Sequence, residues 1–173
     1  MTRDDRNVIV TIRPGRLEDL GALTRIYNHF VENTHITFDL EPFTVESRRE
    51  WFGHYAATGR HRLLVAEAAD GDIVGYATSG RFRDKPAYAP SVETTVYCAP
   101  EAVGHGVGSA LYGGLFEALQ GEDVHRAYAG VALPNDASLA LHRRFGFTEI
   151  GTFREVGRKF GEWWDVTWLE RMV

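Results

Sequence analysis

The spacing of apolar residues divides the chain into short strands and helices. An alternating run over residues 7–15 ends in Pro-Gly, which predicts a strand closed by a turn. Apolar residues over 16–34 recur at helical spacing and predict an amphipathic helix. After an irregular stretch over 35–43, Thr44 can cap a second helix that we expect to extend to Gly59.

The second half of the chain combines strand patterns with helix patterns. Two β-rich runs flank Asp70-Gly71-Asp72, which predicts a hairpin. Strand, helix, strand and helix follow, and then two strands that turn around Gly161; these segments span 91–100, 108–121, 126–133, 135–147 and 148–173. This order is neither alternating βαβα nor all-β. We therefore expect a single α/β (α+β) domain over residues 1–173, with a mixed, mostly antiparallel twisted sheet and helices on both faces.

Composition narrows the class of protein. Of the 173 residues, 44% are hydrophobic and 25% charged, as is typical of soluble globular proteins. The net charge of -5, without a Lys/Arg cluster, argues against a nucleic-acid partner. No apolar run is long enough to cross a membrane or to resemble a signal peptide. Cys98 is the only cysteine, so we expect no intrachain disulfide and a cytoplasmic location, and the histidine spacing predicts no metal site.

Three glycines stand at alternate positions between a predicted strand and a predicted helix. They are Gly104, Gly106 and Gly108. Glycine lets the backbone approach a ligand closely, and the N-terminus of a helix offers free N–H groups to an anion. The pattern therefore favours a phosphate site, although a simple turn or a mononucleotide-binding fold is also possible. It is not a P-loop, because no Lys-Ser/Thr follows, and it lacks the two-residue gap of a Rossmann fingerprint.

Four separated motifs resemble the GNAT family of acyl-CoA N-acyltransferases, in particular phosphinothricin acetyltransferases and relatives acting on methionine sulfoximine. The motifs are "IYNHFVENTHITFD", "VETTVYCAPEAVGHGVGSALY", "LPNDASLALHRRFGF" and "FREVGRKFGEWWDVTWLE". The family signature is Arg/Gln-x-x-Gly-x-Gly/Ala. Gly106 and Gly108 match its two glycines, whereas Val103 stands in place of the Arg or Gln.

The resemblance implies acetyl-CoA as co-substrate. The strand before the glycine turn would hold the pantetheine arm through its main chain, and the turn would hold the pyrophosphate. Asn135 would contact the pantetheine, although asparagine is also a preferred helix N-cap. The implied cofactor-binding residues are Val96, Tyr97, Cys98, Gly104, His105, Gly106, Val107, Gly108, Ser109 and Asn135.

The resemblance also implies direct acetyl transfer to an amine. The acceptor ammonium must first lose a proton, and Glu93 matches the family's proton acceptor. His142 stands where many relatives carry a tyrosine, and it is a candidate proton donor to the leaving thiolate. A strand glutamate and a structural histidine are the alternative interpretations. We do not expect Cys98 to form a covalent intermediate, because little in the sequence around it would lower the thiol pKa.

Four residues are candidates for binding the acceptor. Arg83 lies in a basic loop before the strand of the candidate base, and its planar guanidinium suits a carboxylate or a phosphinate. Thr94 and Thr95 follow that base, although threonine is also a good strand former. Phe38 would form a wall of the pocket, or part of the core. A solvated loop is the alternative for Arg83.

The expected function is acetyl-CoA-dependent N-acetylation of the α-amine of a small amino acid or analogue of the phosphinothricin, methionine sulfoximine or sulfone type. Polyamines and protein N-termini are alternative acceptors. Val103 leaves a non-catalytic acyl-CoA-binding module open as well. The resemblance further implies a homodimer, and Trp163, Trp164 and Trp168 would pack in the core or in the dimer interface.

Overall fold

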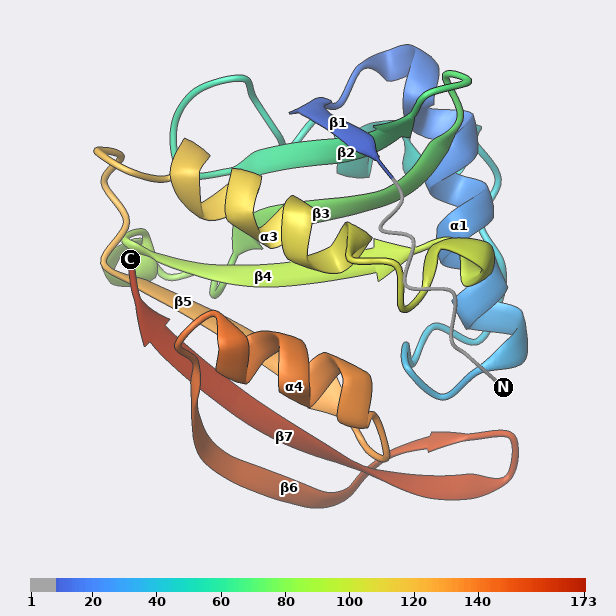
Figure 1. Cartoon of the computed structure of the whole chain (residues 1–173). Coiled ribbons are helices and arrows are strands. Elements are labelled where there is room, and N and C mark those ends of the chain that lie inside the picture. The colour runs from blue at the N-terminus through green and yellow to red at the C-terminus, as the bar shows by residue number, and fades with distance from the viewer. Residues whose placement is uncertain (1–8) are drawn as a thin grey trace, which may run out of the picture.

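The computed structural model describes residues 9–173, which form a seven-stranded sheet with helices on both faces (Figure 1). The strand order is β1-β2-β3-β4-β5-β7-β6, and every neighbouring pair is antiparallel except β4 and β5. The mixed, mostly antiparallel sheet that the sequence predicts is therefore confirmed. The strands are β1 (Val10–Pro14), β2 (Arg62–Ala68), β3 (Ile73–Arg81), β4 (Ser91–Cys98), β5 (Arg126–Ala132), β6 (Thr148–Lys159) and β7 (Glu162–Met172).

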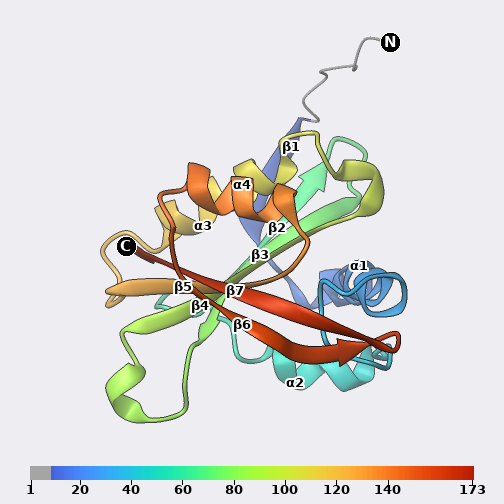
Figure 2. The ribbon, with the colours of Figure 1, turned by 90° about the horizontal axis from the view of Figure 1, so that it is seen from below.

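The helices form one layer on each side of the sheet (Figure 2). On one side lie α3 (Val107–Ala118) and α4 (Asp136–Arg144), and on the other lie α1 (Leu20–Asn33) and α2 (Arg49–Phe52). Short 3-10 helices span Leu17–Asp19, Glu46–Arg48, Pro86–Tyr88 and Pro100–Ala102. The main core fills the space between α3 and the sheet; Leu64, Val92, Leu111 and Leu115 are buried there. Within the described residues, no helix is long and apolar enough to cross a membrane.

Most predicted elements are confirmed. The hairpin between β2 and β3 turns at Gly71, and the one between β6 and β7 turns at Gly161. Both glycines have a positive φ, of 92° and 82°, which side chains disfavour. Asn7 and Val8, at the start of the first predicted strand, lie outside the described residues.

The extent predicted for the second helix is wrong. The Thr44 hydroxyl does accept a hydrogen bond from the backbone three residues later, at 3.1 Å. However, the helical segment ends at Phe52 and not at Gly59. The chain then turns back, and the N–H of Ala56 donates to the carbonyl of His61 at 3.0 Å. This loop leads directly into β2. The backbone hydrogen bond across the loop replaces the bonds that a longer helix would make.

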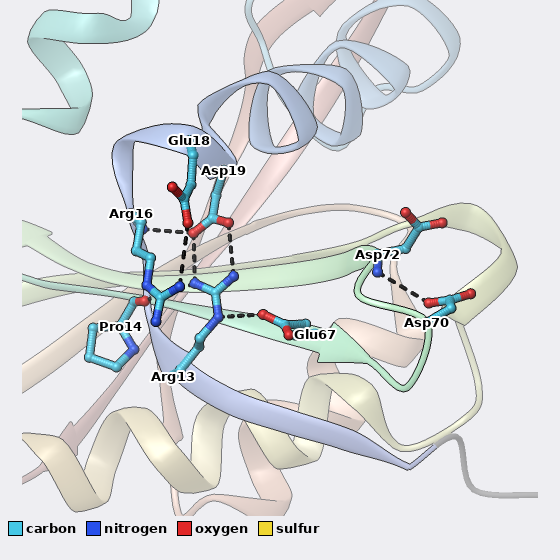
Figure 3. A network of polar contacts seen from close by, with 8 residues as sticks. All are labelled: Arg13, Pro14, Arg16, Glu18, Asp19, Glu67, Asp70 and Asp72. Atoms are coloured by element: carbon cyan, nitrogen blue, oxygen red, sulfur yellow. Dashed lines mark hydrogen bonds and ion pairs between the residues drawn. The ribbon is translucent and has the colours of Figure 1, made fainter.

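An ion-pair network joins β1 and β2 to the start of α1 (Figure 3). The Arg13 guanidinium donates to both oxygens of Asp19, at 2.8 and 2.9 Å, and to Glu67 at 2.5 Å. The backbone N–H of Arg16 also donates to Asp19, at 2.7 Å. Burial alone would raise the pKa of Asp19, but these hydrogen bonds outweigh it and hold the pKa below its usual value. The network thus fixes the position of α1 against the sheet.

Strands β4 and β5 pair only at their starts and then diverge (Figure 1). The parallel register joins Ser91–Glu93 to Arg126–Tyr128 and goes no further. The opposite edge of β4 stays paired with β3 as far as Cys98. Backbone groups over residues 94–98 therefore have an edge without a neighbouring strand, where another extended group can pair.

Candidate active site

A cleft of about 570 Å³ opens where β4 and β5 diverge. Strand β4 forms one wall, β5 and α4 form another, and the glycine turn with the first turn of α3 closes one end. All predicted cofactor-binding residues except His105 line this cleft, as do Thr94, Thr95 and His142; the predicted cofactor residues in its lining are Val96, Tyr97, Cys98, Gly104, Gly106, Val107, Gly108, Ser109 and Asn135.

The glycine turn leaves the N-terminus of α3 without a capping side chain. Gly104 and Gly106 have φ values of 84° and 82°, in the left-handed region that favours glycine. Gly106 is the N-cap of α3, and no side chain of the described residues caps the helix there. The first-turn N–H groups have no carbonyl partner within the helix, and they carry the positive end of its dipole. This end of the cleft therefore suits an anion.

Close packing and weak thiol acidity mark the neighbouring wall. A Cβ atom at Gly108 would lie 3.3 Å from the Leu141 side chain, so this glycine lets α3 approach α4 closely.

Burial raises the pKa of the Cys98 thiol to about 11, which keeps it protonated at neutral pH. The carbonyl oxygen of the Asn135 side chain accepts from the Ser138 N–H at 3.1 Å. The N-cap interpretation of Asn135 is thus confirmed, and its cofactor contact stays a prediction.

Successive side chains of β4 point to opposite faces of the sheet. Thr94 faces the α3 side, where the Tyr112 hydroxyl lies 3.3 Å from its Oγ1. Tyr97 packs edge-on against Tyr27 of α1, with ring centroids 5.1 Å apart. By alternation, Glu93 shares that second face. The structure therefore separates Thr94 from the candidate base, although the two residues are adjacent in sequence.

Glu93 is half-buried and has a cation nearby. Burial raises the pKa of its carboxyl above the ordinary value, and the positive charge of Arg83 partly opposes this shift. The Arg83 side chain is exposed, with its guanidinium 4.5 Å from the ring centroid of Phe82 and 5.8 Å from that of Trp168. Arg81 lies instead near Asp84, at 3.7 Å. Of the two arginines, Arg83 is therefore the one whose charge acts on Glu93.

No motif in the sequence points to Tyr55, which reaches the same face from the loop after α2. Its hydroxyl lies 3.6 Å from the position that a Cβ atom at Gly80 would occupy, and Gly80 is the β3 partner of Glu93. Burial raises the pKa of the Tyr55 phenol, and the charge of Glu93 adds to this rise. A neutral hydroxyl that can donate a hydrogen bond therefore stands beside the candidate base.

The sequence does not distinguish Arg48 either, because the adjacent arginines Arg48 and Arg49 are typical of a solvated surface. The side chain is only 5% exposed, and its guanidinium lies 3.8 Å from the ring centroid of Trp51 and 4.5 Å from that of Tyr27. Among the described residues no carboxylate pairs with it, and its Nη1 atom has no hydrogen-bond partner. Arg48 thus adds a buried positive charge to the Glu93 side of the sheet.

His142 is buried in a chain of hydrogen bonds. Its Nδ1 lies 2.7 Å from the Ser138 carbonyl, which can only accept, so Nδ1 carries the proton. Its Nε2 therefore accepts from the Tyr112 hydroxyl, at 2.8 Å. Burial lowers the pKa of His142, and the hydrogen bond to Ser138 opposes this only in part. These contacts favour a neutral ring whose single N–H is already in use, so the predicted proton-donor role gains no support here.

Phe38 is held against the C-terminal hairpin. A Cβ atom at Gly157 of β6 would lie 2.2 Å from the Phe38 ring, so only glycine leaves room for it. The His35 ring stacks on Trp164 of β7, with centroids 4.1 Å apart. Residues 35–38 therefore pack on the β6–β7 hairpin, and a role of Phe38 as a pocket wall stays a prediction.

Known proteins are similar to this chain in sequence and in fold. A family model for the acetyltransferase (GNAT) domain matches residues 12–168. The chain is 61% identical over 163 residues to the phosphinothricin N-acetyltransferase of Streptomyces coelicolor. The match covers 94% of this chain and 95% of that protein. It is 35% identical over 160 residues to the L-methionine sulfoximine/L-methionine sulfone acetyltransferase of Pseudomonas paraeruginosa, over 92% of each chain.

A solved structure agrees with these sequence matches. The GNAT superfamily phosphinothricin acetyltransferase of Sinorhizobium meliloti, solved in complex with acetyl-CoA, has a TM-score of 0.88 and 31% identity to this chain. The match covers 95% of this chain and 88% of that one. The chain therefore belongs to the GNAT family and is an N-acetyltransferase.

Proposed function

We propose that this enzyme transfers an acetyl group from acetyl-CoA to the α-amine of a small amino acid or analogue of the phosphinothricin, methionine sulfoximine or sulfone type. One observation carries the proposal: Glu93, with a raised pKa, stands where β4 leaves β5 and the cleft begins. The relatives from Streptomyces coelicolor and Pseudomonas paraeruginosa support the class of acceptor.

The cleft fits the cofactor. Acetyl-CoA supplies the acetyl group as an activated thioester. The uncapped N–H groups at the start of α3 suit its pyrophosphate, because no side chain competes for them. The free edge of β4 over Val96–Cys98 suits the amides of the pantetheine arm, which would pair with it as an added strand.

Glu93 would accept the proton of the acceptor ammonium, directly or through one water molecule. Its raised pKa makes the carboxylate a stronger base. Transfer of the proton from the ammonium to Glu93 therefore costs less free energy than transfer to an ordinary glutamate. We assign His142 a positioning role. Its neutral ring accepts a hydrogen bond from the Tyr112 hydroxyl and so holds Tyr112 in place against Thr94.

Charge on the Glu93 side favours an anionic acceptor. Arg83 stands close enough to lower the pKa of Glu93, and Arg48 adds a buried guanidinium. A planar guanidinium binds carboxylate or phosphinate oxygens in pairs. A polyamine would place its own positive charges near these two arginines, so the amino-acid class is favoured over polyamines.

A thiol-release assay with acetyl-CoA tests the proposal. We expect turnover with phosphinothricin, methionine sulfoximine or methionine sulfone, and none with spermidine. Turnover with polyamines or peptide N-termini alone would overturn the choice of acceptor. Tight binding of CoA without thiol release for any amine would identify a non-catalytic acyl-CoA-binding module instead.

We propose further that the enzyme works as a homodimer in the cytoplasm. Strand β6 is one of the two edge strands of the sheet and exposes Ile150, Phe153 and Val156 by 55%, 58% and 53%. An exposed apolar edge strand is a typical site of pairing with another chain. Light scattering should give the mass of a dimer for the wild type and of a monomer for Phe153→Lys; a wild-type monomer would contradict this assignment.

A further inference from the structure

Arg144, the last residue of α4, has no role in the site as described so far. Its Nη1 donates to the Ser109 hydroxyl at 3.4 Å, in the first turn of α3. Apart from the buried His142, it is the only basic side chain among the described residues that line the cleft, and none of these lining residues is acidic. Its neighbour Arg143 instead pairs with Glu149, at 2.5 Å.

Arg144 stands between the C-terminus of α4 and the N-terminus of α3. The negative end of the α4 dipole attracts its guanidinium, whereas the N-terminus of α3 carries a partial positive charge that opposes it. The first turn of α3 contains no acidic residue that would offset this repulsion. Within residues 9–173, no carboxylate forms an ion pair with Arg144 either. The guanidinium and the N-terminus of α3 would both attract a ligand with more than one negative charge bound between them.

Val103 leaves the glycine turn without the polar side chain of the family signature, and Arg144 can take its place. The side chain is 53% exposed and apolar, at the signature position where an Arg or Gln is expected. Arg144 reaches the same end of the cleft from α4. We infer that Arg144 binds the pyrophosphate of CoA and supplies the side-chain contact that Val103 cannot supply from the glycine turn. This inference rests on the acetyl-CoA assignment of the proposed function.

Calorimetric titration with CoA tests the inference without any acceptor. We expect Arg144→Gln to weaken the binding of CoA about tenfold, as for a lost hydrogen bond to a charged group. Arg143→Gln removes an equal charge from the adjacent residue and should leave the affinity nearly unchanged. Equal affinities of wild type and Arg144→Gln would overturn the inference, whereas no CoA binding by the wild type would overturn the cofactor assignment itself.

Two further measurements locate the contact. Dephospho-CoA keeps the pyrophosphate but lacks the 3′-phosphate, so the loss in Arg144→Gln should persist with it. If the loss vanishes, Arg144 contacts the 3′-phosphate and the pyrophosphate assignment is wrong. The double variant Val103→Arg/Arg144→Gln should regain most of the affinity. Failure to regain it would show that Arg144 does not replace the signature residue.

Discussion

The two faces of β4 carry proposed binding regions that are built from different parts of the chain. On the α3 and α4 side, one continuous segment, residues 94–109, supplies the free strand edge and the glycine turn, while β5 and α4 supply the facing wall of the cleft. On the α1 and α2 side, the proposed acceptor region combines the side chains of Arg48, Tyr55, Arg83 and Glu93 from four separate segments. A backbone site tolerates changes of side chain that do not alter its shape. A side-chain site depends on each residue, so its variants should show larger effects that depend on the acceptor.

The largest expected effect is that of Glu93→Gln. The amide cannot take the proton of the ammonium, so kcat should fall by about 10²–10⁴. Binding of acetyl-CoA should be unchanged, because Glu93 is not part of the cleft lining. Steady-state kinetics and calorimetry measure the two quantities. Glu101→Gln, on the exposed turn before the glycines, is the control. An unchanged kcat near neutral pH would remove the assignment of Glu93 as base.

Arg83→Gln should act on the acceptor alone. Loss of a two-pronged contact with the carboxylate should raise the KM for an anionic amino acid about tenfold, with the KM for acetyl-CoA unchanged. Arg81→Gln is the matched control, since Arg81 lies near Asp84. Equal increases in both variants would show that only the general surface charge matters.

Gly106→Ala should affect the opposite side only. At a φ of 82°, a side chain costs about 1–2 kcal/mol, so the KM for acetyl-CoA should rise about fivefold to thirtyfold while that for the acceptor stays the same. Gly21→Ala, in α1 with room for the added methyl group, should leave both KM values unchanged. A change in the acceptor KM of Gly106→Ala would mean that the two sides are coupled.

The pH profile sharpens the comparison. Only the ionised Glu93 accepts a proton, so kcat/KM should fall as the pH drops through its raised pKa, at a higher pH than for an ordinary glutamate. Arg83 lowers this pKa, so Arg83→Gln should move the acidic limb of the profile to higher pH. A limb that stays in place or moves to lower pH would contradict the proximity of the two charges.

The smallest effect concerns stability and His142. Burial lowers its pKa in the folded state below the ordinary 6.5, so the unfolded chain binds more protons as the pH falls. The stabilisation present at neutral pH is therefore lost below about pH 6.5. His142→Asn should show a smaller decrease of Tm than the wild type between neutral pH and about pH 5. An identical decrease would place the titration elsewhere, for example at His61, whose pKa burial also lowers.

The backbone half of the site was readable from the sequence, whereas most of the side-chain half was not. The glycine turn and the strand before it are contiguous, so the motif that they form and its resemblance to the family pointed to residues that line the cleft. Arg48 and Tyr55 follow a helix start that was identified correctly, but their surroundings come from α1, β3 and β4. His142 was found by its position in a motif, yet its proton is fixed by the Ser138 carbonyl and Tyr112.

The sequence alone determined the strands, the turns and the N-termini of the helices, because hydrophobic period, capping and glycine conformation depend on near neighbours. It did not determine the end of the second helix, where a loop closed by Ala56 and His61 replaces the continued helix. Only the tertiary structure decided which charges are buried, paired or free. Desolvation and Coulomb interactions depend on residues that are distant along the chain and adjacent in space.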